Sequence, residues 1–349
     1  MMLRHGWIGL SVLLSACATP PLDAAPPTTA LPWLFENNRA AITEASCQEP
    51  ASEFESEQFY YKAEPVSPEN QSDFDGRLNG LSLVGIWSLT SGRDEFGGLS
   101  GLVVSESGDL MAVSDQGQFI VLPTDRTTGA PAEFGRIAPM RGEDGALLAG
   151  KTQGDAEGLA MRDGVAFVSF ERDHRVSAFD LQNCRGAARE VVISRLKPNV
   201  AGVELPNNRG PEGLALMHDG SLRVGIEARE TGSAVSGTLT TDGALVEVIE
   251  TSPPAFQLLT GIDHRDGLTA IVYRAYDPVR GNRISFTVER GAARIASGSL
   301  KPPEPVDNIE GIALGPLKER KRRLWLISDD NFNPRQRTLL FAFELDATG

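Results

Sequence analysis

The chain has 349 residues, a formal net charge of −14, 41% hydrophobic residues and three cysteines. This acidic balance argues against nucleic acid and anionic membrane surfaces as partners, because both carry the same sign of charge. We therefore expect no nucleic-acid partner, and a membrane contact only through a covalent lipid anchor.

The first sixteen residues have the pattern of a signal peptide. Arg4 precedes an apolar run over residues 6–14, which is too short to cross a bilayer. The motif LSAC at residues 14–17 resembles the lipobox of bacterial lipoproteins, in which the cysteine becomes the lipid-modified first residue. Cleavage before Cys17 would remove Arg4 and move the formal charge from −14 to −15. We expect a periplasm-facing lipoprotein of the cell envelope; an ordinary cleavage site with an incidental cysteine is the alternative.

Residues 17–82 are interpreted as a lipidated tether followed by an irregular arm. The tether, ATPPLDAAPPTTALP with its neighbours, is rich in proline, alanine and threonine, which suits an extended linker. The arm is acidic and shows no sustained period. Cys47 and Cys184 would pair in an oxidising compartment and tie the arm to the main body, whereas two free thiols are the alternative.

Residues 83–349 consist of short apolar stretches separated by glycine turns, which indicates an all-β domain. One hairpin pattern recurs five times, with starts 57, 55, 48 and 50 residues apart, at Ser100, Glu157, Glu212, Thr260 and Glu310. A repeat of about 50 residues is typical of a β-propeller blade. A β-sandwich would explain the strands but not the five copies. We predict a β-propeller of five to six blades, the sixth being degenerate and built partly from residues 83–91.

Each repeat places charged residues at the end of its hairpin that lies away from the turn. Opposite residues in a hairpin have numbers that sum to twice the turn centre. This rule pairs Glu157 with Glu171, Glu212 with Glu227, Glu310 with Asp329, Ser100 with Asp115 and Thr260 with Arg274. Equivalent ends of all blades meet at one face of a propeller, so we expect an acidic ring around a central mouth.

Carboxylates that lie close together raise one another's pKa unless a positive charge lies near them. A bound Ca²⁺, which takes about 6 to 8 oxygen ligands, would neutralise them. Arginine would do the same, and a shared proton would mark a general acid/base pair. An arginine–carboxylate lattice that only holds the blades together is the alternative without any ligand.

We predict a binding or catalytic site at this mouth. The candidate metal ligands are Glu157, Glu212, Glu310, Asp329 and Asp115. The candidate catalytic residues are Glu171, Glu227, Arg274 and Arg172, with Glu171 or the metal activating water and the arginines orienting a phosphate. Other motifs are weaker: the segment GLSG at residues 98–101 is no nucleophile elbow, and His174 is the only histidine expected near the mouth.

The segments FGGLSGL, EGLA, ERDHRV, GPEGLAL, DNIEGIAL and LISDDNFNPRQRTLLFAFEL together resemble the bacterial phytase-like domain described as having esterase-like activity of phytase. The resemblance covers residues 83–345 and implies an exported β-propeller that hydrolyses phosphate or other esters. Propeller phytases hold several Ca²⁺ ions with acidic residues. We expect a monomeric, Ca²⁺-dependent hydrolase of a small anionic ester. A non-catalytic propeller that binds a ligand or a protein in the envelope is the alternative, favoured by the lack of a convincing nucleophile.

Overall fold

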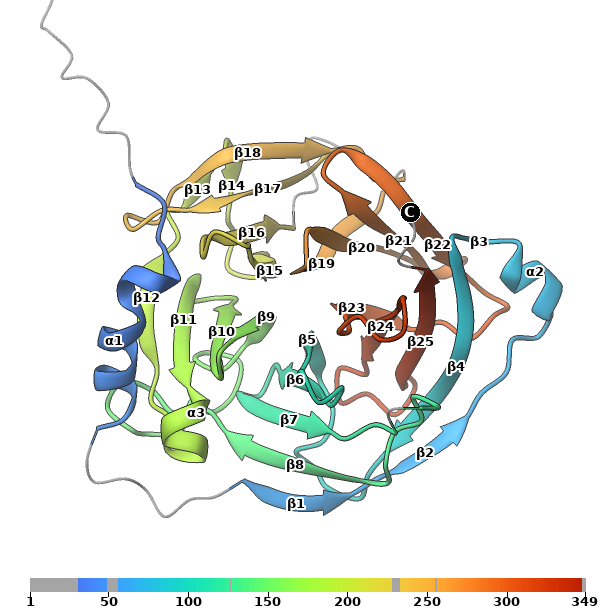
Figure 1. The fold of residues 1–349 in the computed structure, drawn as a ribbon, viewed down its shortest axis with the longest axis horizontal. Helices are drawn as coiled ribbons and strands as arrows, with labels where there is room; N and C mark the ends of the chain where they lie inside the picture. The colour runs from blue at the N-terminus through green and yellow to red at the C-terminus, as the bar shows by residue number, and fades with distance from the viewer. Residues whose placement is uncertain (1–30, 49–55, 126, 228–232, 255, 347–349) are drawn as a thin grey trace, which may run out of the picture.

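The structure is a computed structural model that describes residues 31–48, 56–125, 127–227, 233–254 and 256–346. The expected signal peptide, Cys17 and most of the tether lie outside these residues. Five β-sheets stand around a central axis (Figure 1), so the predicted β-propeller is confirmed, with five blades. In the described part of the chain, no helix is both long enough and apolar enough to cross a membrane.

Each blade starts at the axis with one inner strand. These five strands are β5 (Leu99–Val104), β9 (Ala156–Arg162), β15 (Pro211–Leu216), β19 (Leu258–Arg265) and β23 (Asn308–Leu314). All are short and largely buried, because every blade is covered on both faces by its neighbours.

The outer strands follow in order from the axis. Blade 1 adds β6 (Leu110–Ser114), β7 (Gln118–Leu122), β8 (Phe134–Pro139) and β1 (Glu57–Tyr60). Blade 2 adds β10 (Val165–Phe170), β11 (Arg175–Asp180) and β12 (Val191–Arg195), and blade 3 adds β16 (Leu222–Ile226), β17 (Ala234–Leu239) and β18 (Leu245–Thr251). Blade 4 adds β20 (Leu268–Asp277), β21 (Gly281–Arg290), β22 (Ala293–Leu300) and β3 (Leu78–Asn79). Blade 5 adds β24 (Lys321–Asp329), β25 (Thr338–Asp346), β4 (Leu81–Thr90) and β2 (Lys62–Pro65).

The ring is closed by pairing strands from opposite ends of the chain. Strand β4 runs antiparallel to β25, with Leu81 opposite Leu345 and Leu89 opposite Thr338. Residues 83–91, which the sequence suggested for a sixth blade, therefore complete the fifth.

The N-terminal arm is more regular than the sequence predicted. Its helix α1 (Phe35–Ser46) lies outside blade 2, and α2 (Gln71–Asp75) precedes β3 at the rim of blade 4 (Figure 1). Strands β1, β2 and β3 are only two to four residues long, too short to show a period, and they form because existing sheet edges offer hydrogen-bond partners. Helix α3 (Leu181–Cys184), the 3₁₀ helix η1 (Arg185–Ala187) and the ribbon of β13 (Asn199–Val200) with β14 (Val203–Glu204) complete the elements.

A disulfide joins Cys47, just after α1, to Cys184 at the end of α3. Of the two alternatives left open by the sequence, the structure has the paired one. Beside it, Trp33 and Phe35 pack edge-on against Phe167 of blade 2, with ring centroids 5.6 and 5.4 Å away. The arm is thus fixed to the propeller by one covalent bond and by aromatic packing.

Every inner hairpin contains a β-bulge at the Ser/Glu/Thr-Gly pair of the repeat. The glycine of each pair faces the next inner strand, and in four of the five pairs it faces the backbone of that strand. A methyl group would lie 2.9 Å from the Glu212 carbonyl oxygen at Gly158, and 2.5 Å from the Glu310 carbonyl oxygen at Gly261. The repeated glycine therefore lets neighbouring blades approach at the axis, where any side chain would clash.

Candidate metal and catalytic site at the central mouth

The bulges change the hairpin register that the sequence suggested. The backbone N–H of Glu171 donates to the carbonyl of Asp155, and Asp329 lies opposite Asn308, each two residues earlier than the predicted partner. One residue of this difference comes from the position of the turn and the other from the bulge. The predicted pairings of Glu157 with Glu171 and of Glu310 with Asp329 are therefore wrong, and the same two-residue shift holds in the other blades.

The shift leaves the first residue of each pair unpaired in the bulge, so its side chain can turn toward the axis. Ser100 of blade 1 donates to Glu310 of blade 5 over 3.1 Å, and Arg274 of blade 4 lies 3.2 Å from the same carboxylate. Contacts between three blades thus meet at Glu310, which confirms that these ends gather at one mouth.

Basic and amide groups pair with the acids on one part of this mouth. Lys151 Nζ lies 2.7 Å from the Asp115 carboxylate, and Arg172 Nε donates to Asp155 over 2.6 Å. Asn308 donates to Glu310 over 2.8 Å and, more weakly, approaches Asp329 at 3.4 Å. These contacts have the form of the arginine–carboxylate lattice considered from the sequence.

Another part of the mouth has carboxylates close to one another. Oxygens of Glu171, Glu212 and Glu227 all lie within 4.8 Å of one another, and those of Asp155, Glu157 and Glu171 do the same. Glu171 belongs to both groups and links blade 2 to blade 3. Among the described residues, no ion pair within 4 Å is formed by Glu157, Glu171, Glu212 or Glu227. We refer to these four side chains as the bare carboxylate cluster.

Burial and mutual repulsion raise the pKa values of three carboxyl groups in this cluster. Burial first, and then Asp155 and Glu227, raise the pKa of Glu171 to about 7. The pKa values of Glu157 and Glu212 are raised well above the usual range by burial and by neighbouring carboxylates. Without a cation, part of this cluster is protonated at neutral pH.

The pKa values of three acids outside the cluster are also raised. Burial raises the pKa of Asp329, helped by Glu310, and burial also raises the pKa of Asp115 despite the attraction of Lys151. Burial raises the pKa of Glu310, which Arg274 partly offsets.

Below the mouth the central channel is almost closed. At the level of the inner-strand glycines a cavity of only about 10 Å³ remains, bordered by Gly158, Gly261 and Gly311. That space accommodates about one water molecule. A ligand of the acidic mouth must therefore enter and leave on the same face.

The second aspartate of the segment SDDN holds a neighbouring loop. Asp330 accepts hydrogen bonds from the backbone of Gly98 and Phe332, both at 3.0 Å, and from Thr338 at 2.9 Å. The Phe332 ring packs on the Gly97–Gly98 backbone, where no side chain would fit. Asp329 thus faces the mouth, whereas Asp330 fixes the loop beside it.

Two charged residues of the mouth were not predicted from the sequence. Asp155 stands two residues before Glu157, so the alternation of strand side chains could have placed it on the same face. Lys151 lies in the irregular loop before β9, where no periodic pattern could have indicated it. His174 lies near the mouth as expected, and its Nε2 is 3.2 Å from the Pro206 carbonyl oxygen.

Fold and site together define a five-bladed β-propeller whose central mouth is lined by carboxylates. Residues 94–257 match the family described as "Phytase-like: Esterase-like activity of phytase". This match confirms, over these residues, the resemblance that the sequence motifs suggested.

Similar solved structures include the PQQ-bound aldose sugar dehydrogenase of Streptomyces coelicolor, with 14% identity, a TM-score of 0.39 and coverage of 76% of this chain and 98% of that one. Glutaminyl cyclase of Myxococcus xanthus has 13% identity, a TM-score of 0.43 and coverage of 76% and 96%. An α-L-arabinofuranosidase of Clostridium thermocellum has 13% identity, a TM-score of 0.39 and coverage of 66% and 81%. These similarities are too weak to indicate an activity. No curated protein matches the sequence.

Proposed function

We propose that this protein is a Ca²⁺-dependent hydrolase of phosphate or other esters, with its site at the central mouth. The observation that carries the proposal is the bare carboxylate cluster, in which four acidic side chains from two blades meet without a described cation. Such an arrangement is costly unless a positive ligand or protons neutralise it.

The donor set fits Ca²⁺. Carboxylate oxygens are hard ligands, and a flexible group of them suits the variable coordination of this ion. Glu171, Glu212 and Glu227 would hold the ion, with Glu157 beside them. When bound, Ca²⁺ would supply positive charge for the cluster and for an anionic ester oxygen.

The protein's own residues supply the remaining chemistry of the proposal. A carboxyl group with a pKa of about 7, such as Glu171, can accept a proton from an attacking water near neutral pH. The side chains of Lys151 and Arg172 are 50% and 41% exposed at the edge of the mouth, so each can also contact an anionic substrate. Arg274 is more buried and is engaged with Glu310, which supports a structural rather than a substrate-binding role for it.

The experiment that tests this proposal combines thermal unfolding with an ester assay. The purified protein is unfolded in EDTA and in Ca²⁺, and it is assayed with a panel of phosphate and carboxylate esters under both conditions. We expect Ca²⁺ to raise the melting temperature and to be needed for turnover. An unchanged melting temperature and no Ca²⁺-dependent turnover would refute the metal-dependent hydrolase.

A second candidate is a non-catalytic propeller that binds a ligand or a protein partner. It is favoured by the ion pairs at Asp115, Asp155 and Glu310, which stabilise the mouth without any reaction. His174 also lacks a neighbouring serine or cysteine nucleophile among its described hydrogen-bond partners. Ca²⁺-dependent stabilisation without turnover on any ester would support this candidate.

We further propose that the protein is a monomeric lipoprotein of the cell envelope that faces the periplasm. The proposal is supported by the LSAC motif and by the Cys47–Cys184 disulfide, since such bonds persist in oxidising compartments. Metabolic labelling with a radioactive fatty acid tests it. The wild-type chain should incorporate the label, and a Cys17→Ser variant should not.

A further inference from the structure

A cavity of the propeller lies far from the acidic mouth, at the turn end of the hairpins. It has a volume of about 590 Å³ and lies between blades 5 and 1. Its walls are the β5–β6 turn, the loop after β7, the loop between β23 and β24, and the starting residues of β24. A cavity of this size is in the range of small-molecule sites. The proposed hydrolase does not use it.

Basic side chains form one wall of this pocket. Lys318, Lys321 and Arg323 belong to the segment KERKRR at residues 318–323, an unusually basic stretch for a chain of net charge −14. Lys318 and Lys321 stand opposite each other across a two-residue turn. The two turn residues, Glu319 and Arg320, have positive φ angles of 50° and 67°, although glycine and asparagine are the usual residues in such positions.

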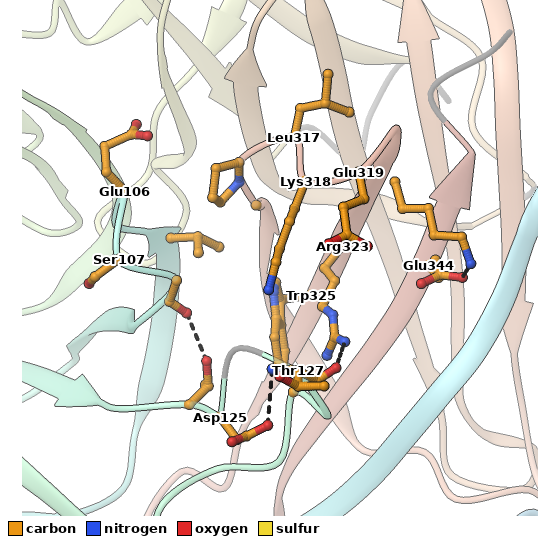
Figure 2. Close-up of a pocket in the computed structure, with 17 residues that line it drawn as sticks. Glu106, Ser107, Asp125, Thr127, Leu317, Lys318, Glu319, Arg323, Trp325 and Glu344 are labelled. Carbon is orange, nitrogen blue, oxygen red and sulfur yellow. Dashed lines mark hydrogen bonds and ion pairs between the residues drawn. The ribbon is translucent and has the colours of Figure 1, made fainter.

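Acidic side chains balance these cations within the same pocket. Glu344 contacts Lys321 over 2.6 Å, and Glu106 pairs with Arg265 at the opposite side. Figure 2 shows Lys318 and Trp325 in the middle of the pocket, with Glu106 to one side and Glu344 to the other. Carboxylates, basic groups and hydroxyls thus all line the cavity.

The balance of charges selects against a charged ligand. The basic wall would attract an anion, but the lining carboxylates would repel it. A cation would be attracted by the carboxylates and repelled by the basic wall. A hydroxyl group both donates and accepts hydrogen bonds, so it can bridge a carboxylate and an ammonium group. Leu317, which is 53% exposed, provides apolar surface for the C–H face of such a ligand.

We infer that this pocket is a second binding site that takes an uncharged polyhydroxylated ligand, a short saccharide. A bound saccharide would contact blade 5 and blade 1 at once. Blade 5 contains both the N-terminal strand β4 and the C-terminal strand β25. Binding is therefore expected to stabilise the join between first and last blades, because a ligand that binds only the folded state raises the melting temperature.

The test uses the purified full-length chain and a set of neutral saccharides: maltotriose, cellobiose, lactose and chitobiose. Binding is measured by saturation-transfer NMR and by the shift in melting temperature. Inorganic phosphate and pyrophosphate are tested in the same way as anionic ligands. We expect at least one saccharide to bind and to raise the melting temperature, while the anions give neither effect through this pocket.

Two variants test whether the saccharide binds in this pocket. Thr127→Trp fills the pocket from the loop after β7, where the Thr127 side chain is exposed and makes no described hydrogen bond, and Leu317→Trp fills it from the opposite wall. Thr241→Trp, in an exposed turn of blade 3, is the matched control. Both pocket variants should lose saccharide binding, and the control should keep it; circular dichroism verifies that each variant folds.

Three results would overturn the inference. The first is a chain that binds none of the saccharides. The second is saccharide binding that both folded pocket variants retain, which would place the site elsewhere. The third is phosphate or pyrophosphate binding that the pocket variants abolish, which would make the pocket an anion site. None of these results depends on Ca²⁺ or on ester hydrolysis, so the outcome is independent of the proposed function.

Discussion

Gly311 of the last inner strand lies directly against the carbonyl oxygen of Ser100 in the first. A methyl group at Gly311 would lie 2.5 Å from that oxygen and 2.9 Å from the Leu102 side chain. The same kind of contact joins blade 1 to blade 2, blade 2 to blade 3 and blade 4 to blade 5, and here it closes the ring at the axis.

The first prediction concerns this contact. Gly311→Ala should lower the free energy of unfolding by about 1 to 3 kcal/mol, because the extra methyl forces two blades apart. Urea unfolding of the purified chain measures the effect. Gly92→Ala is the matched control, since a side chain at Gly92 meets nothing within 4 Å. Equal stability of the two variants would mean that the inner strands adjust without cost.

The five-bladed architecture could be predicted because each blade repeats one local pattern. The Ser/Glu/Thr-Gly pair marks the same bulge in every inner strand, and the spacing of the copies gives the blade length. The residues that lie opposite each other in the hairpins could not be predicted, since the bulge and the turn each shift the register by one residue. The pairing of β4 with β25 closes the ring and joins segments about 250 residues apart. A repeat pattern in the sequence cannot predict such a pairing.

The candidate site was predictable only in part for the same reason. Glu157, Glu212 and Glu310 were found because they belong to the repeat, and Glu171 because it ends the hairpin. Lys151 was not, since it reaches Asp115 from a loop without regular structure. The sequence also gave no means to separate the part of the mouth held by basic side chains from the bare carboxylate cluster.

The second prediction concerns the Cys47–Cys184 disulfide, which closes a loop with a sequence separation of 137 residues. Replacing both cysteines by serine should lower the free energy of unfolding by about 2 to 5 kcal/mol. Limited proteolysis should then cut near α1 faster than in the wild-type chain. The wild-type chain treated with a reducing agent serves as the control and should behave like the double variant. Equal stability of oxidised and reduced chains would show that aromatic packing alone fixes the arm.

The third prediction concerns pH. The carboxyl groups of Glu157, Glu171 and Glu212 have raised pKa values in the folded chain, so the folded state binds more protons than the unfolded one. In EDTA, stability should therefore fall as the pH rises from about 4, near the unfolded value of glutamate, through the folded value of about 7 for Glu171. Urea unfolding between pH 4.5 and 8 measures the slope.

The control for this pH dependence of stability is the same measurement with Ca²⁺. A bound cation favours the ionised carboxylates, so added Ca²⁺ should stabilise the chain most at pH 8 and least near pH 4.5. Stability that rises with pH in EDTA would contradict the crowding of these side chains.

The fourth prediction separates the two candidate functions through Glu212. In Glu212→Gln one carboxylate leaves the bare cluster while the shape of the side chain is kept. If the cluster binds Ca²⁺ for catalysis, the variant should fold, lose most of the Ca²⁺-dependent rise in melting temperature, and lose turnover about 10²-fold or more. Its stability in EDTA at pH 8 should equal or exceed that of the wild-type chain, because like-charge repulsion is reduced.

A purely structural mouth predicts a different result for the same variant. If Glu212 only held neighbouring blades together through its contacts, the change to glutamine should destabilise the chain in EDTA as well as in Ca²⁺. Glu250→Gln, on the exposed outer strand β18, is the matched control and should leave both the melting temperature and the response to Ca²⁺ unchanged. A Glu212→Gln variant with a full response to Ca²⁺ would exclude this side chain as a ligand and move the metal site away from the cluster.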